Sequence, residues 1–463
     1  MDQVGLYIAS PIILILALIL YIINPELSIK LLELSIIVVY VSSIYIFTKK
    51  HNNLINTHNI FLVVFGFFVL SRVFLHFFGY SHFNETKFFT SYTFEIDVIF
   101  RTLINVQLAL VSFVIGSIFY LQQKPVKDRQ PVDTTDNQLY FVGLFGMILL
   151  TPFLLMYIYE TVSFIHKYGY LAIHQGARIN NQTFYKLIIM VSMASYIIFI
   201  SSRPKNGVYY WLFTILLIFV LLADGKRGPG ITFLIVSLWY YLLYKRINFN
   251  LIRVLGGAII LFLVLIIIGT FRYKGGKEIE SYSILDFIYK QGVSVQVVSY
   301  SIKYSDKIDY SLFDLIFGKI YKISNVMIMK ITGNNPDLSL FSRAHKYKIF
   351  SSYISSIVNP DLYIKGFGIG GSYIAQLFSV GKEFGQIIVG FLLGIGYSFL
   401  DKLIYSRNRI VIGIVLFLLP SIIYIARDNM FDFIIDSIIS IVFFLIIHFI
   451  IYIMRKYRIK IKL

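Results

Sequence analysis

The chain is dominated by apolar stretches about as long as a lipid bilayer is thick. A helix needs about 20 mainly apolar residues to cross the hydrocarbon core, and a membrane interior leaves such a segment no alternative to helical hydrogen bonding. About twelve stretches of this kind follow one another, near residues 6–23, 31–47, 60–79, 97–121, 139–158, 185–201, 208–223, 229–244, 252–271, 385–400, 410–426 and 433–454. The sequence therefore predicts an all-α polytopic membrane protein with about twelve transmembrane helices.

The composition excludes several classes of protein. Hydrophobic residues make up 57% of the 463 residues and charged residues only 14%, whereas soluble domains carry about 25% charged residues. This excludes a cytosolic enzyme and a nucleic-acid-binding protein, although the net charge is +18. Cysteine is absent, so the chain has no disulfide, no thiolate nucleophile and no cysteine-based metal site.

Basic residues indicate the orientation of the spans, because Lys and Arg concentrate in cytoplasmic loops. With a cytoplasmic N-terminus, the short inner loops hold most of the basic residues, including Lys49, Lys50, Arg203 and Lys205. The C-terminal tail is also strongly basic. We therefore expect both termini on the cytoplasmic side of the membrane.

One connection is much longer than the others and divides the chain into three predicted parts. Residues 1–271 hold nine spans, residues 272–384 form an outer loop, and residues 385–463 hold three spans and the basic tail. A structureless loop of this length is unusual in a compact protein. Within the loop, Leu312–Thr332 has apolar residues at helical spacing, which predicts an amphipathic helix in the membrane interface. Ser283–Tyr304 is a second helix candidate.

Three arginines at outer ends of spans are candidates for anion binding. Arg227 lies in the turn 224–230, where Pro229 favours the start of a helix and glycines allow a close backbone approach. Arg272 follows the ninth span and Arg427 the eleventh. Three guanidinium groups at one membrane depth would grip a diphosphate through paired hydrogen bonds. The alternative is that each arginine reaches lipid phosphates at the membrane surface.

Charged residues near the third and fourth spans have two interpretations each. Arg72 and Arg101 lie inside these spans, where they either pair with acidic groups or line a cavity. Glu95 and Asp97 precede the fourth span, at a spacing found in metal-dependent lipid-linked glycosyltransferases and also in ordinary solvated loops.

The outer loop contains one candidate general base and one candidate backbone site. His345 follows Arg343 and precedes Lys346, and a neighbouring cation lowers the pKa of an imidazole, which suits a neutral base. The alternative is an ordinary surface histidine. The segment 366–372, rich in glycine, follows no strand and is therefore no dinucleotide loop, but its backbone amides would suit a sugar or a phosphate.

Several motifs resemble the O-antigen polysaccharide polymerases of the Wzy family. They are Phe287-Ile-Tyr-Lys-Gln-Gly-Val-Ser294, Gly368-Ile-Gly-Gly-Ser-Tyr-Ile-Ala-Gln376 with Phe384-Gly385, and Gly225-Lys-Arg-Gly228. The resemblance extends from about residue 200 onward, and before that it concerns topology alone. The layout is also distantly similar to that of the O-antigen ligases, which implies a GT-C-like fold.

The similarity to the ligases implies roles for individual residues. Arg227 and Arg272 would hold a lipid diphosphate. The ligases place a histidine near the tenth span, but this chain has none there, so Glu383 and His345 both stay open as the base. The further candidate substrate-binding residues are Arg427, Lys226, Tyr273, Arg343, Gln291 and Tyr373.

The resemblance implies a polymerase that joins undecaprenyl diphosphate-linked oligosaccharide repeat units at the periplasmic face of the bacterial inner membrane. Because diphosphate is a good leaving group, such an enzyme needs cations near that group and a base near the acceptor hydroxyl. It requires no metal or other cofactor, and back-side attack would invert the anomeric carbon. The implied partners are membrane lipids and a chain-length regulator protein.

Two other functions remain open. One is a flippase for lipid-linked oligosaccharide, which would carry two similar halves and charges at the bilayer midplane. The other is a metal-dependent glycosyltransferase that uses a polyprenyl monophosphate sugar, with Glu95 and Asp97 as metal ligands. Sensitivity to a chelator would distinguish this enzyme from the polymerase.

Overall fold

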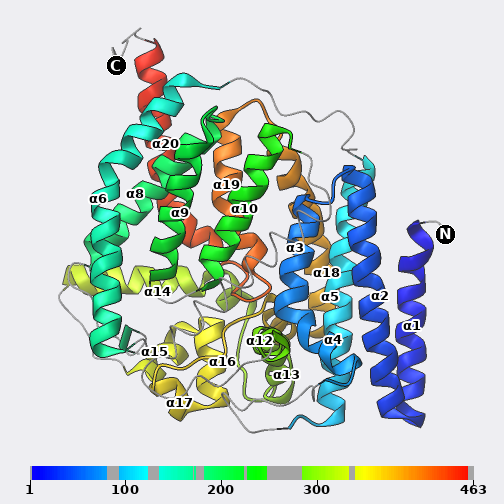
Figure 1. Cartoon of the computed structure of the whole chain (residues 1–463). Helices are drawn as coiled ribbons and strands as arrows, with labels where there is room; N and C mark the ends of the chain where they lie inside the picture. The colour runs from blue at the N-terminus through cyan, green and yellow to red at the C-terminus, as the bar shows by residue number, and fades with distance from the viewer. Residues whose placement is uncertain are drawn as a thin grey trace. The chain divides into compact units, whose positions relative to one another are not determined.

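The computed structural model describes residues 3–80, 93–123, 135–169, 172–173, 182–223, 227–247, 284–332 and 339–456. Within these ranges the chain is helical and contains no strand (Figure 1). Seven of the helical segments described are long and apolar enough to cross a membrane, and three shorter apolar helices accompany them. The predicted all-α polytopic architecture is confirmed. The predicted ninth span, 252–271, lies outside the described residues.

The chain forms two compact units. Unit 1 comprises Met1–Lys127, Glu278–Phe399 and Ile423–Asp432, and unit 2 comprises Asp128–Lys277, Leu400–Ile422 and Phe433–Leu463. Unit 1 therefore combines the beginning of the chain with most of the predicted outer loop.

The first four spans of unit 1 correspond closely to the predicted stretches. They consist of α1 (Gln3–Ile23), α2 (Pro25–His51), the run α3 (Thr57–Phe65), η1 (Gly66–Leu70) and α4 (Ser71–Phe77), and α5 (Ile96–Gln123). Pro25 begins α2 because its fixed φ and missing N–H suit a first helical turn, and the side chain of Asn24 accepts a hydrogen bond from the Leu27 amide. The third span contains a π-helical turn, η1, which shifts the register of the side chains that follow it.

The predicted outer loop folds into short helices. They are α12 (Ile284–Gln291), α13 (Val293–Lys303), α14 (Leu312–Thr332), α15 (Leu340–Tyr347), α16 (Phe350–Val358) and α17 (Pro360–Ile364). Helix α14 has the predicted bounds and runs across the direction of α2 and α5 (Figure 1). Leu312 and Met327 are 58% and 59% exposed, while Leu315 is buried. An amphipathic helix at a membrane surface would expose apolar side chains in this way. The second candidate, Ser283–Tyr304, is divided into α12 and α13 at Gly292.

Helix α18 (Tyr373–Leu403) is interrupted at Lys382, whose backbone leaves the helical region. The part after this kink contains the predicted tenth span and packs closely on α5. A Cβ atom on Gly394 would collide with the Phe113 carbonyl oxygen, and one on Gly116 with the Phe391 carbonyl oxygen. Small residues let two membrane helices approach until their backbones touch.

Unit 2 contains α6 (Asn137–Tyr168), α8 (Gln182–Ser201), α9 (Gly207–Ala223), α10 (Arg227–Lys245) and most of α19 (Arg409–Tyr424) and α20 (Asp432–Lys456). Helix α6 packs against α8 and α9, and α9 packs against α10.

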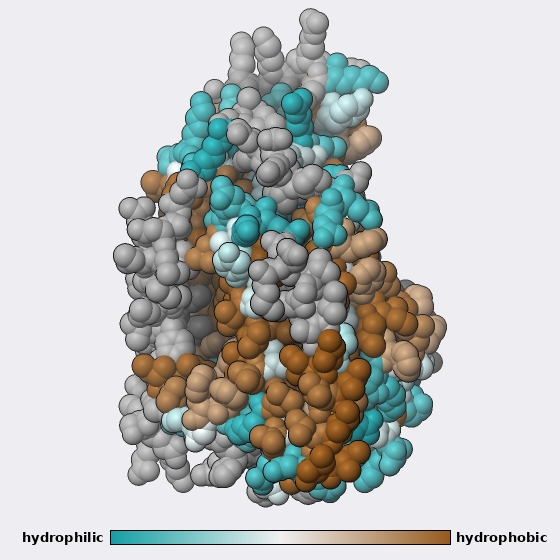
Figure 2. Space-filling view, turned by 90° about the vertical axis from the view of Figure 1, so that its right-hand side faces the viewer, coloured by the Kyte–Doolittle hydropathy of each residue, from teal (hydrophilic) through white to brown (hydrophobic). Residues whose placement is uncertain are grey.

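Apolar side chains cover much of the protein surface, as in other membrane proteins. On α1, Ile15 and Ile22 are 58% and 86% exposed. Figure 2, which turns the face with α1 and α2 toward the viewer, shows broad apolar areas beside hydrophilic ones. Such continuous apolar surface would be a liability in water, and it is what contact with lipid tails requires.

The contact between α5 and α18 yields a stability prediction. Gly394→Ala places a methyl group against the Phe113 carbonyl, whereas a Cβ on Gly396, two residues later, meets nothing within 4 Å. We expect Gly394→Ala to destabilise the protein by about 1–3 kcal/mol and Gly396→Ala to be neutral or slightly stabilising. The melting temperatures of both purified variants in detergent test this. Equal melting temperatures would contradict the close approach of the two helices.

Candidate functional site

Two arginines that are far apart in the sequence meet the same end of one short helix. Arg72, at the start of α4, donates from Nε to the Tyr289 carbonyl oxygen over 2.9 Å. Arg427, which follows α19, donates from Nη1 to the Gln291 carbonyl oxygen over 3.3 Å. Both acceptors belong to the last turn of α12, where carbonyl groups have no partner within the helix and carry the negative end of its dipole.

Aromatic rings support both guanidinium groups. The Cζ atom of Arg72 lies 4.1 Å from the centroid of the Tyr289 ring, and that of Arg427 lies 5.4 Å from the centroid of Phe68. Phe68 belongs to the π-helical turn η1, which directly precedes Ser71 and Arg72. The shift of register at η1 thus positions the Phe68 ring beside the Arg427 guanidinium, and Arg72 follows this turn in the sequence.

Gly292 allows α12 and α4 to approach each other. A Cβ atom at this position would collide with the side chains of Ser71 and Arg72. The motif 287–294 therefore has a structural explanation: its carbonyl groups bind two arginines, and its glycine leaves room for one of them.

The glycine-rich segment 366–372 packs on the turn that carries Arg427. A Cβ on Gly371 would lie 3.0 Å from both Asn429 Oδ1 and the Asp428 carbonyl carbon. Gly370 has φ of +81°, a conformation that glycine adopts without strain. The segment makes an ordered, close contact with the turn 427–429.

Asn429 holds this turn in place. Its Nδ2 donates to Ser351 Oγ over 3.2 Å and to Asp432 Oδ2 over 2.9 Å, and its Oδ1 accepts from the Ser351 amide over 3.1 Å. Gln376 Oε1 accepts from the amide of Met430 over 2.6 Å. These four hydrogen bonds thus fix the backbone of the turn that contains Arg427.

Gln376 extends the same network toward the helices of the outer loop. Its Nε2 donates to Tyr310 Oη over 3.2 Å. Burial raises the pKa of the Tyr310 phenol. Because Tyr310 stays neutral, the network supplies hydrogen bonds without adding a charge beside Arg427.

The kink in α18 presents a second pair of charges. Lys382 has φ of +51° and ψ of −140°, and the next residue, Glu383, lies 3.4 Å from Arg101 Nη2 through its Oε1. Both side chains are partly exposed, at 36% for Glu383 and 40% for Arg101. The ring of Phe378 lies near two cations, 4.6 Å from Lys382 Nζ and 5.6 Å from Arg101 Cζ.

His345 packs among the helices of the predicted outer loop. Its Nε2 lies 3.2 Å from Ser356 Oγ, and its ring centroid is 4.3 Å from that of Phe341 and 5.2 Å from that of Tyr353. Burial and the Lys348 ammonium lower the pKa of the imidazole. Arg343, the predicted substrate-binding residue two positions before His345, is exposed.

The other predicted site residues are distributed unevenly. Arg227 begins α10 in unit 2, and only its backbone is described. Lys226, Arg272 and Tyr273 lie outside the described residues. Tyr373 is fully buried, and its amide donates to the Ile425 carbonyl oxygen over 3.2 Å. Of the predicted site residues, Arg427 and Gln291 are therefore in contact, and Tyr373 packs next to the turn that carries Arg427. The predicted roles of the remaining site residues stay predictions.

Glu95 directly precedes α5, and Asp97 lies in its first turn. Glu95 and Asp97 are both exposed. Neither belongs to a group of three or more possible metal ligands in the described parts of the chain.

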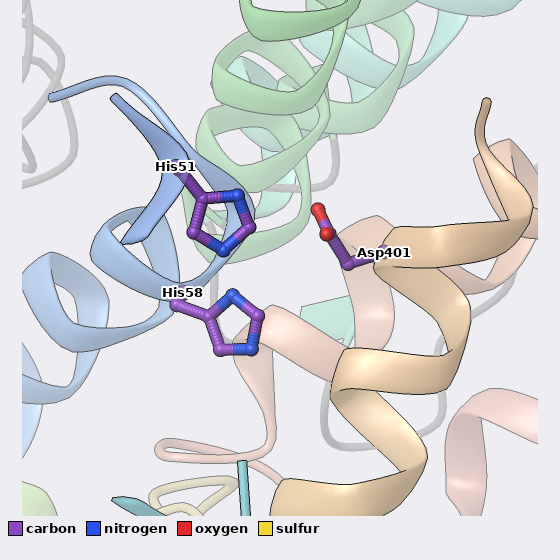
Figure 3. A group of neighbouring side chains, drawn as sticks. All are labelled: His51, His58 and Asp401. Atoms are coloured by element: carbon purple, nitrogen blue, oxygen red, sulfur yellow. The ribbon is translucent and has the colours of Figure 1, made fainter. Parts of the chain in front are cut away.

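Two histidines form a separate ring contact where α2 ends and α3 begins. The ring centroids of His51 and His58 lie 5.1 Å apart, and Figure 3 shows the two side chains. His58 also stacks on Phe47 and lies 2.8 Å from Ser398 Oγ through its Nε2. These contacts indicate a structural role in joining α3 to α2 and α18.

The kink at Lys382 yields a second stability prediction. A non-glycine residue in this left-handed conformation costs about 1–3 kcal/mol, and glycine removes most of that cost. We expect Lys382→Gly to raise the melting temperature and Lys382→Val to lower it. Gly381→Ala is the matched control, because a Cβ there meets nothing within 4 Å. A lower melting temperature for Lys382→Gly would contradict the strained conformation.

A family model described as O-antigen polysaccharide polymerase Wzy matches residues 6–458, nearly the whole chain. No curated protein and no solved structure matches the chain.

Proposed function

The chain belongs to the O-antigen polysaccharide polymerase Wzy family, and we propose that it joins repeat units carried on undecaprenyl diphosphate at the periplasmic face of the membrane. Membership establishes a polymerising enzyme of the glycosyltransferase type, a membrane setting and a lipid-linked oligosaccharide substrate. The identity of the lipid diphosphate, the face of the membrane and the mechanism are parts of the proposal.

The observation that carries the proposal is the convergence of three segments in unit 1. The turn that carries Arg427 contacts both the end of α12 and the glycine-rich segment 366–372. Together they place a partly exposed guanidinium beside an ordered backbone. This combination suits a phosphate and the sugar attached to it.

Cationic groups provide the chemistry that such a transfer needs. Outside the cytoplasm a glycan is extended with a donor that carries its own activation, and here the leaving group is the lipid diphosphate. Negative charge develops on this group as the glycosidic bond breaks, and fixed arginines in a site with little water stabilise that charge. We assign this role to Arg227 and Arg272, with Arg427 as a substrate-binding residue. No metal or other cofactor takes part in this scheme.

Glu383 is the favoured general base. It is partly exposed and stands at the kink of α18, where Arg101 orients its carboxylate. In the proposed reaction it takes the proton from the acceptor hydroxyl, whose oxygen attacks the anomeric carbon opposite the diphosphate and inverts it. His345 is less suited as the general base, because its imidazole ring already contacts Ser356, Phe341 and Tyr353.

The proposed arrangement in the membrane follows from the basic loops. Cytoplasmic termini place the outer helices α12–α17 in the periplasm, on the side where lipid-linked repeat units are polymerised. The exposed apolar side chains of α14 support its position at the outer membrane surface. A chain-length regulator protein would bind on the same side.

Glu383 is tested by polymerisation of purified lipid diphosphate-linked repeat units. We expect Glu383→Gln to lower the rate by about 10²-fold or more, because the amide accepts no proton at neutral pH. Asp306→Asn is the matched control, since Asp306 is an exposed outer carboxylate. A near-normal rate for Glu383→Gln, with a large loss in His345→Gln, would move the role to His345.

The same assay tests the proposed function itself. Wild-type protein should build polymer from repeat units alone and should do so in excess chelator. Loss of activity in chelator would favour Glu95 and Asp97 as metal ligands. No polymer from the wild type, together with the complete absence of surface repeat units in a deletion strain, would favour the flippase.

Arg227 and Arg272 are predicted to act as one unit on the diphosphate. If both contact the same group, removal of either already disables charge stabilisation, so their effects should not add. We expect the Arg227→Ala/Arg272→Ala double variant to be little slower than the slower single variant. Rate losses that multiply in the double variant would argue against a shared site.

A further inference from the structure

The end of α12 carries more positive charge than its surroundings balance. Arg72 and Arg427 bring two full charges to carbonyl groups whose helix dipole amounts to about half a negative charge. In the part of the chain that the structure describes, neither guanidinium has a carboxylate within salt-bridge distance. Asp428, the sequence neighbour of Arg427, turns its Oδ1 to the Asn429 amide.

Of the two arginines, Arg72 is the more costly to bury. It is only 3% exposed, and a buried charge without a counter-charge is costly. Its Nη1 is buried and has no hydrogen-bond partner among the described residues.

Further unused polar atoms lie at the same place. Ser71 Oγ, which Gly292 approaches closely, and Ser294 Oγ are both buried and unpaired among the described residues. Both flank the junction of α12 and α13. Buried polar groups in folded proteins are normally paired, so an unused donor on a buried cation, with the unpaired Ser71 hydroxyl nearby, favours an anion-binding site.

We propose that Arg72 is a further guanidinium of the substrate site and that it binds, together with Arg427, a phosphate group of the lipid diphosphate. The proposal rests on the proposed function and adds a binding residue to it. Arg427 is partly exposed and would contact an entering phosphate before Arg72 does. Arg72 is buried and would bind the same phosphate from the protein interior. Two planar guanidinium groups offer paired donors, which match phosphate oxygens better than a single ammonium does.

Binding and polymerisation by two substitutions of Arg72 test this. Arg72→Met removes the charge and keeps an unbranched apolar side chain, and Arg72→Lys keeps the charge but loses the planar fork. Lys307→Met is the matched control, because Lys307 is an exposed cation of the predicted outer loop whose Nζ lies 5.6 Å from the centroid of the Tyr304 ring. Each protein is purified, and its melting temperature is measured with and without inorganic pyrophosphate at constant ionic strength.

We expect pyrophosphate to raise the melting temperature of the wild type and of Lys307→Met. In Arg72→Met and Arg72→Lys this rise should be lost or at least halved. Without the anion, Arg72→Met should melt no lower than the wild type, because it removes an unbalanced buried charge. In the polymerisation assay, KM for the lipid diphosphate-linked donor should rise at least tenfold in both variants.

Three results would overturn the inference. The first is equal protection of wild type and Arg72→Lys by pyrophosphate. The second is a much lower melting temperature of Arg72→Met without anion while Arg72→Lys keeps the wild-type KM, which would mean that Arg72 only caps α12. The third is protection by phosphatidylglycerol in nanodiscs that undecaprenyl diphosphate does not displace, which would assign the site to bulk lipid.

Failure of the inference and failure of the proposed function give different results. If the wild type polymerises repeat units and Arg72→Lys retains the wild-type KM, the inference is wrong and the polymerase stands. If the wild type builds no polymer although pyrophosphate protects it and does not protect Arg72→Lys, the anion site stands and the proposed reaction is wrong.

Discussion

The C-terminal end of α12 is the interaction on which the rest of the candidate site depends. Its carbonyl groups hold Arg72 from the third span and Arg427 from the turn after α19. Each arginine would be difficult to bury alone, and the carbonyl groups and aromatic rings reduce that cost without neutralising the charge. A cationic site that stays charged and fixed is what the transfer of a sugar from a diphosphate requires.

The remaining features of unit 1 keep this arrangement fixed. The Asn429 network secures the turn of Arg427, and Gly371 lets the glycine-rich segment pack against that turn. The kink at Lys382 ends the buried first part of α18 and starts a long membrane helix that packs on α5 through Gly394. The strained residue thus stands beside Glu383, the proposed base, and strain at such positions is common in functional sites.

Much of the fold could be predicted because it depends on local sequence. Apolar stretches of membrane length indicated the described spans, and helical periodicity gave the bounds of α14. The site depends on contacts over long separations, such as 217 residues between Arg72 and Tyr289. From sequence alone, pairing of Arg72 with an acidic group was somewhat favoured over a place in a cavity, but among the described residues no carboxylate lies within salt-bridge distance of it. The kink could not be predicted from the sequence either, because the residue with a positive φ is Lys382 and not the neighbouring Gly381.

A cryo-electron microscopy structure of the protein in nanodiscs with bound undecaprenyl diphosphate tests the proposed site most directly. We expect phosphate density within hydrogen-bonding distance of both the Arg427 and the Arg72 guanidinium, at the end of α12. Diphosphate density elsewhere in the protein, with the guanidinium groups of Arg72 and Arg427 contacting only protein, would contradict it.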